Sequence, residues 1–178
     1  MYVVKNTSRG ACVELPYWRR GTERSAAFSK KRKSRFLEDI ISAPCRSEET
    51  EQIAAEFAST LKSGDVIAYK GPMGAGKTAF TRGLCKGLGL SDHVSSPTFA
   101  LVHQYGNGSR ALYHFDMYRV ETFEDLYSTG FFDYLDYGGI LAIEWSENIE
   151  AILPENTITV EIRKVDGDPE QREILISQ

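Results

Sequence analysis

The residues with the clearest chemical signal are 71–78, which read Gly-Pro-Met-Gly-Ala-Gly-Lys-Thr. This order fits G-x-x-x-x-G-K-[ST], the pattern of a phosphate-binding loop between a strand and a helix. Glycines at three of these positions allow the backbone to wrap around a phosphate chain with its N–H groups pointing inward. The Lys77 side chain would reach the β- and γ-phosphates, and the Thr78 hydroxyl would bind Mg²⁺. The sequence therefore predicts that residues 71–78 bind a nucleoside triphosphate.

Hydrolysis or transfer of a phosphoryl group also requires an acidic residue near the metal, and two positions qualify. Asp116 ends the largely apolar segment 112–116, and Glu144 ends the apolar segment 140–144. In open α/β sheets ligands gather outside the carboxyl ends of the strands, where both acids are expected to emerge. The spacing does not decide which acid binds metal and which orients water. The structural alternative is that each acid simply ends a strand at the surface.

Other polar residues have two interpretations each. Thr98, after Pro97, could sense the γ-phosphate as mobile switch segments do, or it could be a simple turn residue. Arg119 could neutralise phosphate charge or pair with an acidic neighbour, and structural pairing is the more common case. The three histidines lack the spacing of metal ligands and are interpreted as structural or surface residues: His93, His103 and His114.

The elements around these residues follow from hydrophobic periodicity and turn residues. A helix is predicted to begin with Ser47 as N-cap and to stop at Gly64. Further helices are predicted at 77–88 and 123–135. Strands are predicted at 36–41, 65–70, 99–105, 111–115, 140–143, 157–162 and 173–176, with hairpin turns at 106–109 and 165–168. Helices on a sheet that mixes parallel and antiparallel strands give an α/β fold, which we expect to have the three layers of P-loop NTPases.

Charge divides the chain into two parts. Residues 1–35 hold ten Lys and Arg against two Glu, a net charge of +8, whereas residues 36–178 hold eleven basic and twenty-three acidic residues, a net charge of −12. Because the first part lacks hydrophobic periodicity, we interpret it as a disordered basic extension. It is either a solvated tail or a segment that contacts RNA phosphates. Residues 36–178 are predicted to form one P-loop ATPase domain.

Composition also bears on the compartment. No stretch approaches the roughly 20 apolar residues of a membrane span, and the N-terminus lacks the apolar region of a secretory signal. The cysteines are odd in number and irregularly spaced, which predicts neither a disulfide framework nor a zinc site: Cys12, Cys45 and Cys85. The expectation is a cytoplasmic protein.

Four segments together resemble the TsaE family of small bacterial ATPases, formerly called YjeE. They are residues 71–78, Ser96-Pro97-Thr98-Phe99, His114-Phe115-Asp116-Met117-Tyr118-Arg119 and Glu144-Trp145. The resemblance runs from about Phe36 to the C-terminus. It implies an ATP-hydrolysing subunit that is required for threonylcarbamoyladenosine modification of tRNA and that acts with TsaB and TsaD. The implied cofactors are ATP and Mg²⁺, and tRNA would be reached indirectly through the complex.

The resemblance implies roles for single positions as well. Lys77, Asp116 and Glu144 would act in catalysis, and Thr78 with Glu144 would hold Mg²⁺. The nucleotide would contact Gly74, Ala75, Gly76, Lys77, Thr78, Ala79, Thr50 and Trp145. Two features depart from the family pattern. Pro72 stands where the family loop often has an acidic residue, and residues 1–35 have no counterpart.

Two other functions are compatible with a phosphate-binding loop. A small-molecule kinase would use the same loop, although it normally adds an arginine-rich lid, and here the arginines are scattered. A nucleotide-gated binding module would bind ATP with negligible turnover. For the ATPase we expect weak hydrolysis by the chain alone and faster hydrolysis with TsaB and TsaD.

Overall fold

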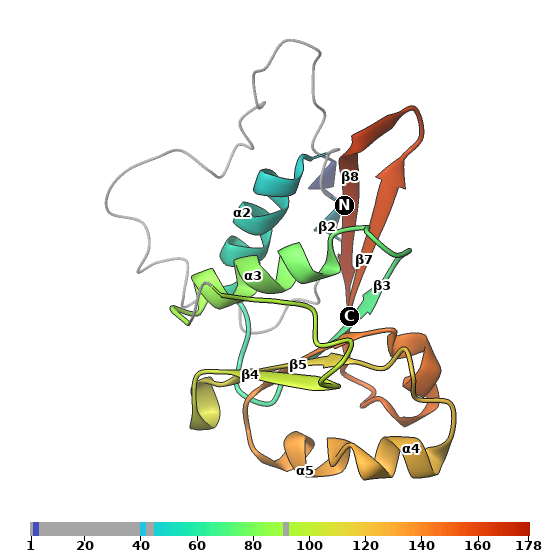
Figure 1. Ribbon diagram of the computed structural model, residues 1–178. Coiled ribbons are helices and arrows are strands. Elements are labelled where there is room, and N and C mark those ends of the chain that lie inside the picture. The colour runs from blue at the N-terminus through green and yellow to red at the C-terminus, as the bar shows by residue number, and fades with distance from the viewer. Residues whose placement is uncertain (1, 4–39, 42–44, 91–92) are drawn as a thin grey trace.

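The computed structural model describes residues 2–3, 40–41, 45–90 and 93–178, and within them an eight-stranded sheet forms the centre of the fold (Figure 1). The strands lie in the order β1-β2-β8-β7-β3-β6-β5-β4. Their bounds are β1 Tyr2–Val3, β2 Ile40–Ile41, β3 Val66–Lys70, β4 Val102–Tyr105, β5 Leu112–Asp116, β6 Ile140–Glu144, β7 Ile158–Val165 and β8 Asp168–Ser177.

The sheet is mixed, as predicted. Strand β3 pairs in parallel with both β6 and β7, and β5 pairs in parallel with β6. The hairpins β4–β5 and β7–β8 add antiparallel pairs on either side. Because β3, β5 and β6 run in the same direction, their carboxyl ends meet at one edge of the sheet. This edge receives the phosphate-binding loop after β3, Asp116 at the end of β5 and Glu144 at the end of β6.

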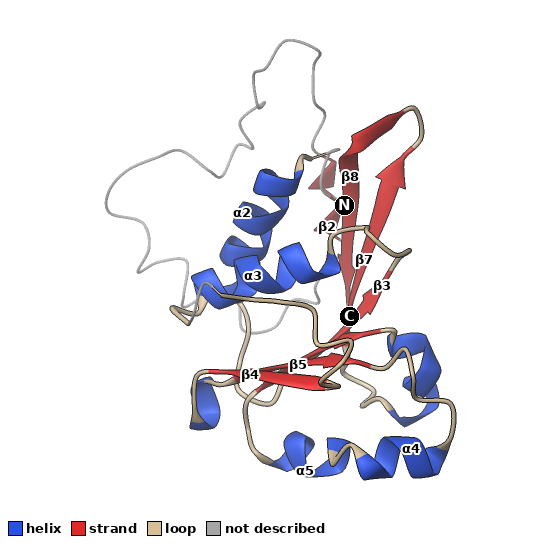
Figure 2. Ribbon diagram, in the orientation of Figure 1, coloured by secondary structure: helices blue, strands red, loops and turns tan. Residues whose placement is uncertain are grey.

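Helices cover both faces of this sheet, which gives three layers (Figure 2). The bounds of the α-helices are α2 Ser47–Ala58, α3 Lys77–Gly87, α4 Phe123–Ser128 and α5 Phe131–Asp136, and those of the 3₁₀ helices are η1 Gly108–Arg110 and η2 Ser146–Ile152. Helices α2 and α3 pack on one face with Ile67 and Ala142, and α4 and α5 pack on the other with Leu141 and Phe115. The alternation of side chains along each strand therefore builds two separate cores.

Helices α2 and α3 pack so closely that one of them needs a glycine at the contact. A Cβ added to Gly83 in α3 would overlap the carbonyl oxygen of Glu51 in α2 and lie 2.6 Å from the Cβ of Ala54. The Glu51 carboxylate also forms ion pairs with Arg82 at 2.7 Å and Lys86 at 2.6 Å, both of α3. This packing fixes the helix that begins at Lys77, and so fixes the end of the phosphate-binding loop.

Several predicted boundaries differ from the structure. The N-cap of α2 is Arg46, whose backbone N–H donates to Glu49, so Ser47 is already helical. That helix ends at Ala58, well before Gly64. The predicted strand 99–105 begins only at Val102, because residues 98–100 form a turn and Leu101 has φ 65°. The predicted helix 123–135 is two helices, because Gly130 is left-handed with φ 71°.

The predicted N-terminal extension contributes one described element. Strand β1 pairs in parallel with β2, so Tyr2–Val3 is part of the sheet. The rest of 1–35 lies outside the described residues, as do residues 36–39 of the predicted first strand. The boundary at residue 36 therefore stays a prediction. Within the part of the chain that the structure describes, no helix combines the length and apolar character needed to cross a membrane.

Candidate nucleotide-binding and catalytic site

The phosphate-binding loop has the backbone that its glycines predict. Gly71, Gly74 and Gly76 have φ values of 133°, 70° and 117°, which side-chain-bearing residues rarely adopt. At Gly71 there is a second constraint, because an added Cβ would overlap the carbonyl oxygen of Ile162 in β7. Helix α3 begins immediately after Gly76, so its N-terminal N–H groups and dipole face the loop. The segment is therefore shaped to bind an anion.

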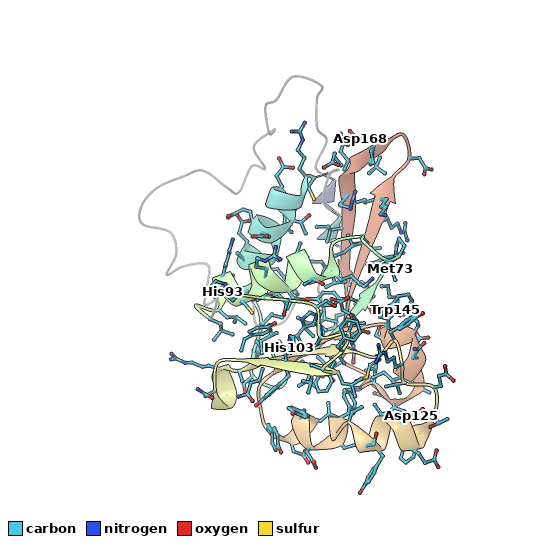
Figure 3. The ribbon with its side chains drawn as sticks, in the orientation of Figure 1. Met73, His93, His103, Asp125, Trp145 and Asp168 are labelled. Atoms are coloured by element: carbon cyan, nitrogen blue, oxygen red, sulfur yellow. The ribbon has the colours of Figure 1, made fainter. Side chains whose placement is uncertain are left out.

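Lys77 is held inside the loop rather than exposed on α3. Its side chain is 5% exposed, and its Nζ donates to the carbonyl oxygens of Gly71 at 2.9 Å and Pro72 at 3.0 Å. The same Nζ lies 5.3 Å from the centroid of the Trp145 ring. Trp145 follows β6 with φ 58°, an unusual conformation for a bulky residue. Figure 3 shows Trp145 and Met73 of the loop on the same side of the molecule.

An arginine from the opposite end of the chain supports the loop from outside. Arg172 of β8 donates from Nε to the carbonyl oxygen of Ala75 at 2.8 Å, and from Nη2 to that of Gly74 at 3.4 Å. Its Nη1 donates to Pro169 at 2.6 Å, which fixes the guanidinium in the β7–β8 hairpin. The peptide N–H that follows the Gly74 carbonyl belongs to Ala75 and donates to the carbonyl oxygen of Pro72 at 3.1 Å, so the backbone of residues 72–75 is fixed from both sides.

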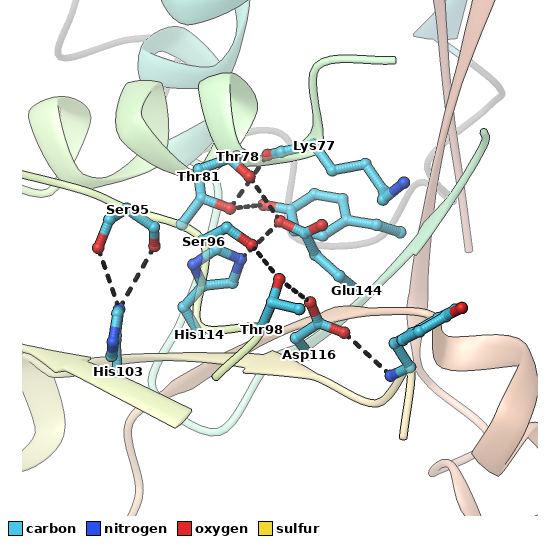
Figure 4. A network of polar contacts seen from close by, with 12 residues as sticks. Lys77, Thr78, Thr81, Ser95, Ser96, Thr98, His103, His114, Asp116 and Glu144 are labelled. Carbon is cyan, nitrogen blue, oxygen red and sulfur yellow. Dashed lines mark hydrogen bonds and ion pairs between the residues drawn. The ribbon is translucent and has the colours of Figure 1, made fainter. Parts of the chain in front are cut away.

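Glu144 is the acid nearest to the loop. Its Oε1 accepts hydrogen bonds from Thr78 Oγ1 at 2.8 Å and from His114 Nε2 at 2.9 Å (Figure 4). Burial raises the pKa of Glu144, but the hydrogen bonds from His114 and Thr78 and the charge of Lys77 outweigh it, so this pKa lies below its usual value. Glu144 is therefore an ionised carboxylate at neutral pH although it is only 6% exposed.

Asp116 is held by a different set of groups. Its Oδ2 accepts from Thr98 Oγ1 at 2.6 Å, and its Oδ1 accepts from the backbone N–H of Tyr118 at 2.9 Å. Ser96 contacts Thr98 at 2.8 Å, so the turn after Pro97 is tied to this carboxylate (Figure 4). Asp116 is opposite Glu144 in the register of β5 and β6, which puts the two acids side by side.

The oxygen atoms of Thr78 and Glu144 fit Mg²⁺. A hydroxyl and an ionised carboxylate are hard donors, and they are already within 2.8 Å of one another at the start of α3. Mg²⁺ commonly takes only one or two protein ligands and completes its shell with water and phosphate oxygens. The described residues contain no group of three or more His, Cys, Asp or Glu that could hold a metal on their own.

The predicted residues do not all come together. Residues 74–79, Asp116, Glu144 and Trp145 gather at one edge of the sheet, through the contacts given above. For Thr50, no contact with the loop is found among the described residues: it is 1% exposed, and its hydroxyl donates to the carbonyl oxygen of Arg46 at 3.2 Å and lies 3.5 Å from Cys45 Sγ. Arg119 stacks on Phe99, with 5.2 Å between the guanidinium carbon and the ring centroid.

Two residues of the site were missed as functional candidates. His114, interpreted from the sequence as structural or surface, contacts Glu144 directly. A signal for it exists in the sequence, since it lies two positions before Asp116 on a strand and so shares its face. Arg172 has no such signal, because it is 97 residues from Ala75 and reaches it only through the sheet order.

The comparisons with known proteins agree with this geometry. Residues 45–174 match the family model described as threonylcarbamoyl adenosine biosynthesis protein TsaE. The tRNA threonylcarbamoyladenosine biosynthesis protein TsaE of Bacillus subtilis is 41% identical over 131 residues, which are 73% of this chain and 80% of that protein. Its Treponema pallidum counterpart is 36% identical over 132 residues, 74% of this chain and 95% of that protein.

A solved structure gives the same result for the fold. The crystal structure of YdiB from Bacillus subtilis superposes with a TM-score of 0.65 and 32% sequence identity, covering 81% of this chain and 88% of that one. Since the family match spans most of the described fold and includes both carboxylates and the phosphate-binding loop, this chain belongs to the TsaE family.

Proposed function

We propose that this protein is an ATP-hydrolysing subunit of the machinery that makes threonylcarbamoyladenosine in tRNA, and that it acts with TsaB and TsaD. The observation that carries the proposal is the contact between Thr78 and Glu144, at 2.8 Å, beside a phosphate-binding loop in a member of the TsaE family. The relatives given above are named as proteins of tRNA threonylcarbamoyladenosine biosynthesis.

Binding of ATP follows from the loop. Backbone N–H groups of residues 74–79 would hold the phosphates, with Lys77 donating to the β- and γ-phosphates instead of to the carbonyls of Gly71 and Pro72. Arg172 would keep the loop backbone in the shape that this requires. Trp145 lies close enough to Lys77 to border the phosphate site.

The two acids would have different roles in hydrolysis. Thr78 and Glu144 would hold Mg²⁺, which, when bound, neutralises the charge that develops on the β- and γ-phosphate oxygens. Asp116, on the neighbouring strand, would orient the attacking water or the Ser96–Thr98 turn that contacts it. An acid that is fixed by two hydrogen bonds is already oriented, so little reorganisation is needed during the reaction.

The partners and the compartment follow from the same proposal. The TsaE-like subunit would drive the cycle of a complex in which TsaD transfers the threonylcarbamoyl group, and it would reach tRNA only through that complex. This takes place in the cytoplasm, where tRNA is modified.

The experiment that tests the proposal is phosphate release from ATP by the purified chain, alone and with TsaB and TsaD, for wild type and Glu144→Ala. We expect slow release by the chain alone, stimulation by the two partners, and loss of the stimulated rate in Glu144→Ala. A phosphorylated acceptor in place of free phosphate would show a kinase instead. Binding of ATP without turnover in the presence of both partners would show a nucleotide-gated module.

A further inference from the structure

We propose that His114 is a positioning residue that fixes the Glu144 carboxylate for Mg²⁺, an inference that rests on the proposed function. The starting observation is that two donors share one oxygen of Glu144. Thr78 Oγ1 and His114 Nε2 both donate to Oε1, at 2.8 and 2.9 Å. Two fixed donors on one oxygen determine the rotation of the carboxylate, and no other oxygen of the described residues competes for the Nε2 proton.

The imidazole is well placed for this role because it is buried beside the carboxylate. His114 is completely buried in β5, with Ala142 of β6 beside it on one side and His103 of β4 on the other. Side chains in a close-packed interior sit in rotamer minima, which limits the positions that the ring can take. Figure 4 shows the ring between its strand and the Glu144 carboxylate.

The two ring nitrogens of His114 have different surroundings. Nδ1 is buried and has no hydrogen-bond partner among the described residues. An ionised carboxylate can only accept a hydrogen bond, so the contact with Glu144 requires a proton on the ring nitrogen that faces it, Nε2.

The face of the strand explains why this position can serve the metal site. Residues 114 and 116 are two apart on β5, so His114 and Asp116 point to the same side of the sheet. That side also carries Glu144, which is opposite Asp116 in register. One strand thus supplies the second acid and the support of the first, in the way that metal ligands commonly depend on hydrogen-bonded neighbours.

The test separates positioning from mere core packing by measuring binding, not turnover. Calorimetry with a non-hydrolysable ATP analogue, with and without Mg²⁺, gives the gain in affinity that Mg²⁺ confers. For His114→Leu we expect this gain to fall about tenfold while the Mg²⁺-free affinity stays unchanged, as outer-shell partners of metal ligands typically contribute 10–100-fold. His103→Leu is the matched control, because His103 lies on the adjacent strand and contacts Ser95 instead.

A second pair of variants keeps the test valid if the leucine variant does not fold. In His114→Gln the amide nitrogen can take the place of Nε2, whereas in His114→Asn it is too short to reach Glu144. We expect the glutamine variant to keep the Mg²⁺ gain and the asparagine variant to lose it.

Three results would overturn the inference: a wild-type Mg²⁺ gain in His114→Asn, an equal loss in the glutamine and asparagine variants, or an equal loss of affinity with and without Mg²⁺. Failure of the wild-type protein to bind the analogue at all would instead contradict the proposed function.

Discussion

The neighbouring carboxylates of Glu144 and Asp116 have different hydrogen-bond partners. Glu144 is bound by the Thr78 hydroxyl at the start of α3, whereas Asp116 is bound by the Thr98 hydroxyl in the turn before β4. The sequence leaves open which acid serves the metal. The contact with Thr78, a residue of the phosphate-binding loop, supports Glu144 in that role and leaves Asp116 for water or for the turn.

Replacing Lys77 tests the loop itself. Lys77→Ala removes the only side-chain charge of residues 71–78, so we expect nucleotide affinity to fall by about a hundredfold or more. Calorimetric titration with ATP measures this, and Lys70→Ala is the control, since Lys70 pairs with Glu150 outside the loop. Near wild-type affinity in Lys77→Ala would mean that the nucleotide binds elsewhere.

Replacing Asp116 separates binding from turnover. Asp116→Ala leaves the loop, Thr78 and Glu144 intact, so we expect ATP affinity to stay within about threefold and hydrolysis to fall by about a hundredfold. Single-turnover phosphate release with TsaB and TsaD present measures the rate, with the exposed Asp136→Ala as control. Unchanged hydrolysis would show that Asp116 has been given the wrong role.

At the scale of elements, helix packing and one hairpin hold the loop in place. Helix α3 is fixed against α2 by the close approach at Gly83 and by the ion pairs of Glu51. The β7–β8 hairpin reaches the loop with Arg172. The site therefore depends on elements that are far from it in sequence.

Gly83→Ala should be destabilising, although Gly→Ala in a helix normally stabilises by about 1 kcal/mol. The added Cβ would overlap the backbone of α2, so the helices must separate, and we expect the free energy of unfolding to fall by about 1–3 kcal/mol. Urea unfolding followed by circular dichroism measures the change, with the exposed Gln52→Ala in α2 as control. A stabilised Gly83→Ala would contradict the close packing.

Arg172→Met should weaken binding of ATP and ADP alike. It removes two donors to loop carbonyls but keeps most of the side-chain volume, so we expect about tenfold lower affinity for both nucleotides. Arg163→Met on the same hairpin is the control, since Arg163 pairs with Glu161. Equal affinities in the two variants, with unchanged thermal stability, would exclude a role for Arg172 in shaping the loop.

The elements that could be predicted from sequence are those with strong local signals. Strand β3, the loop and α3 follow from an apolar run, three glycines and helical periodicity, and they form where predicted. Residues 99–101 were wrongly predicted as the beginning of a strand because Phe99 and Leu101 are residue types that favour strands. Phe99 is 89% exposed, and Leu101 is left-handed, so tertiary context overrides propensity there.

The contacts of His114 and Arg172 required the sheet order. Local periodicity does not predict the order of strands in the sheet. That order places β5 next to β6 and brings β8 to the loop. Most residues named from the family resemblance lie together, and for Thr50 no contact with the loop is found among the described residues. The roles of all of them stay predictions that the variants above test.

At the scale of the whole molecule, charge limits what residues 36–178 can bind. No Lys or Arg occurs from residue 120 to residue 162, and residues 36–178 carry a net charge of −12. Such a surface repels the phosphate backbone of tRNA. It fits a subunit that reaches tRNA through protein partners, as proposed, while the charge of +8 is confined to residues 1–35.

The most direct test of the central claim is the amount of threonylcarbamoyladenosine in tRNA, measured by mass spectrometry of digested nucleosides. Cells depleted of this protein would be complemented with the wild-type chain or with Lys77→Ala, expressed at equal levels. We expect the modified nucleoside to be lost on depletion, restored by the wild type and not restored by Lys77→Ala. Normal levels of the nucleoside in depleted cells, or full restoration by Lys77→Ala, would contradict it.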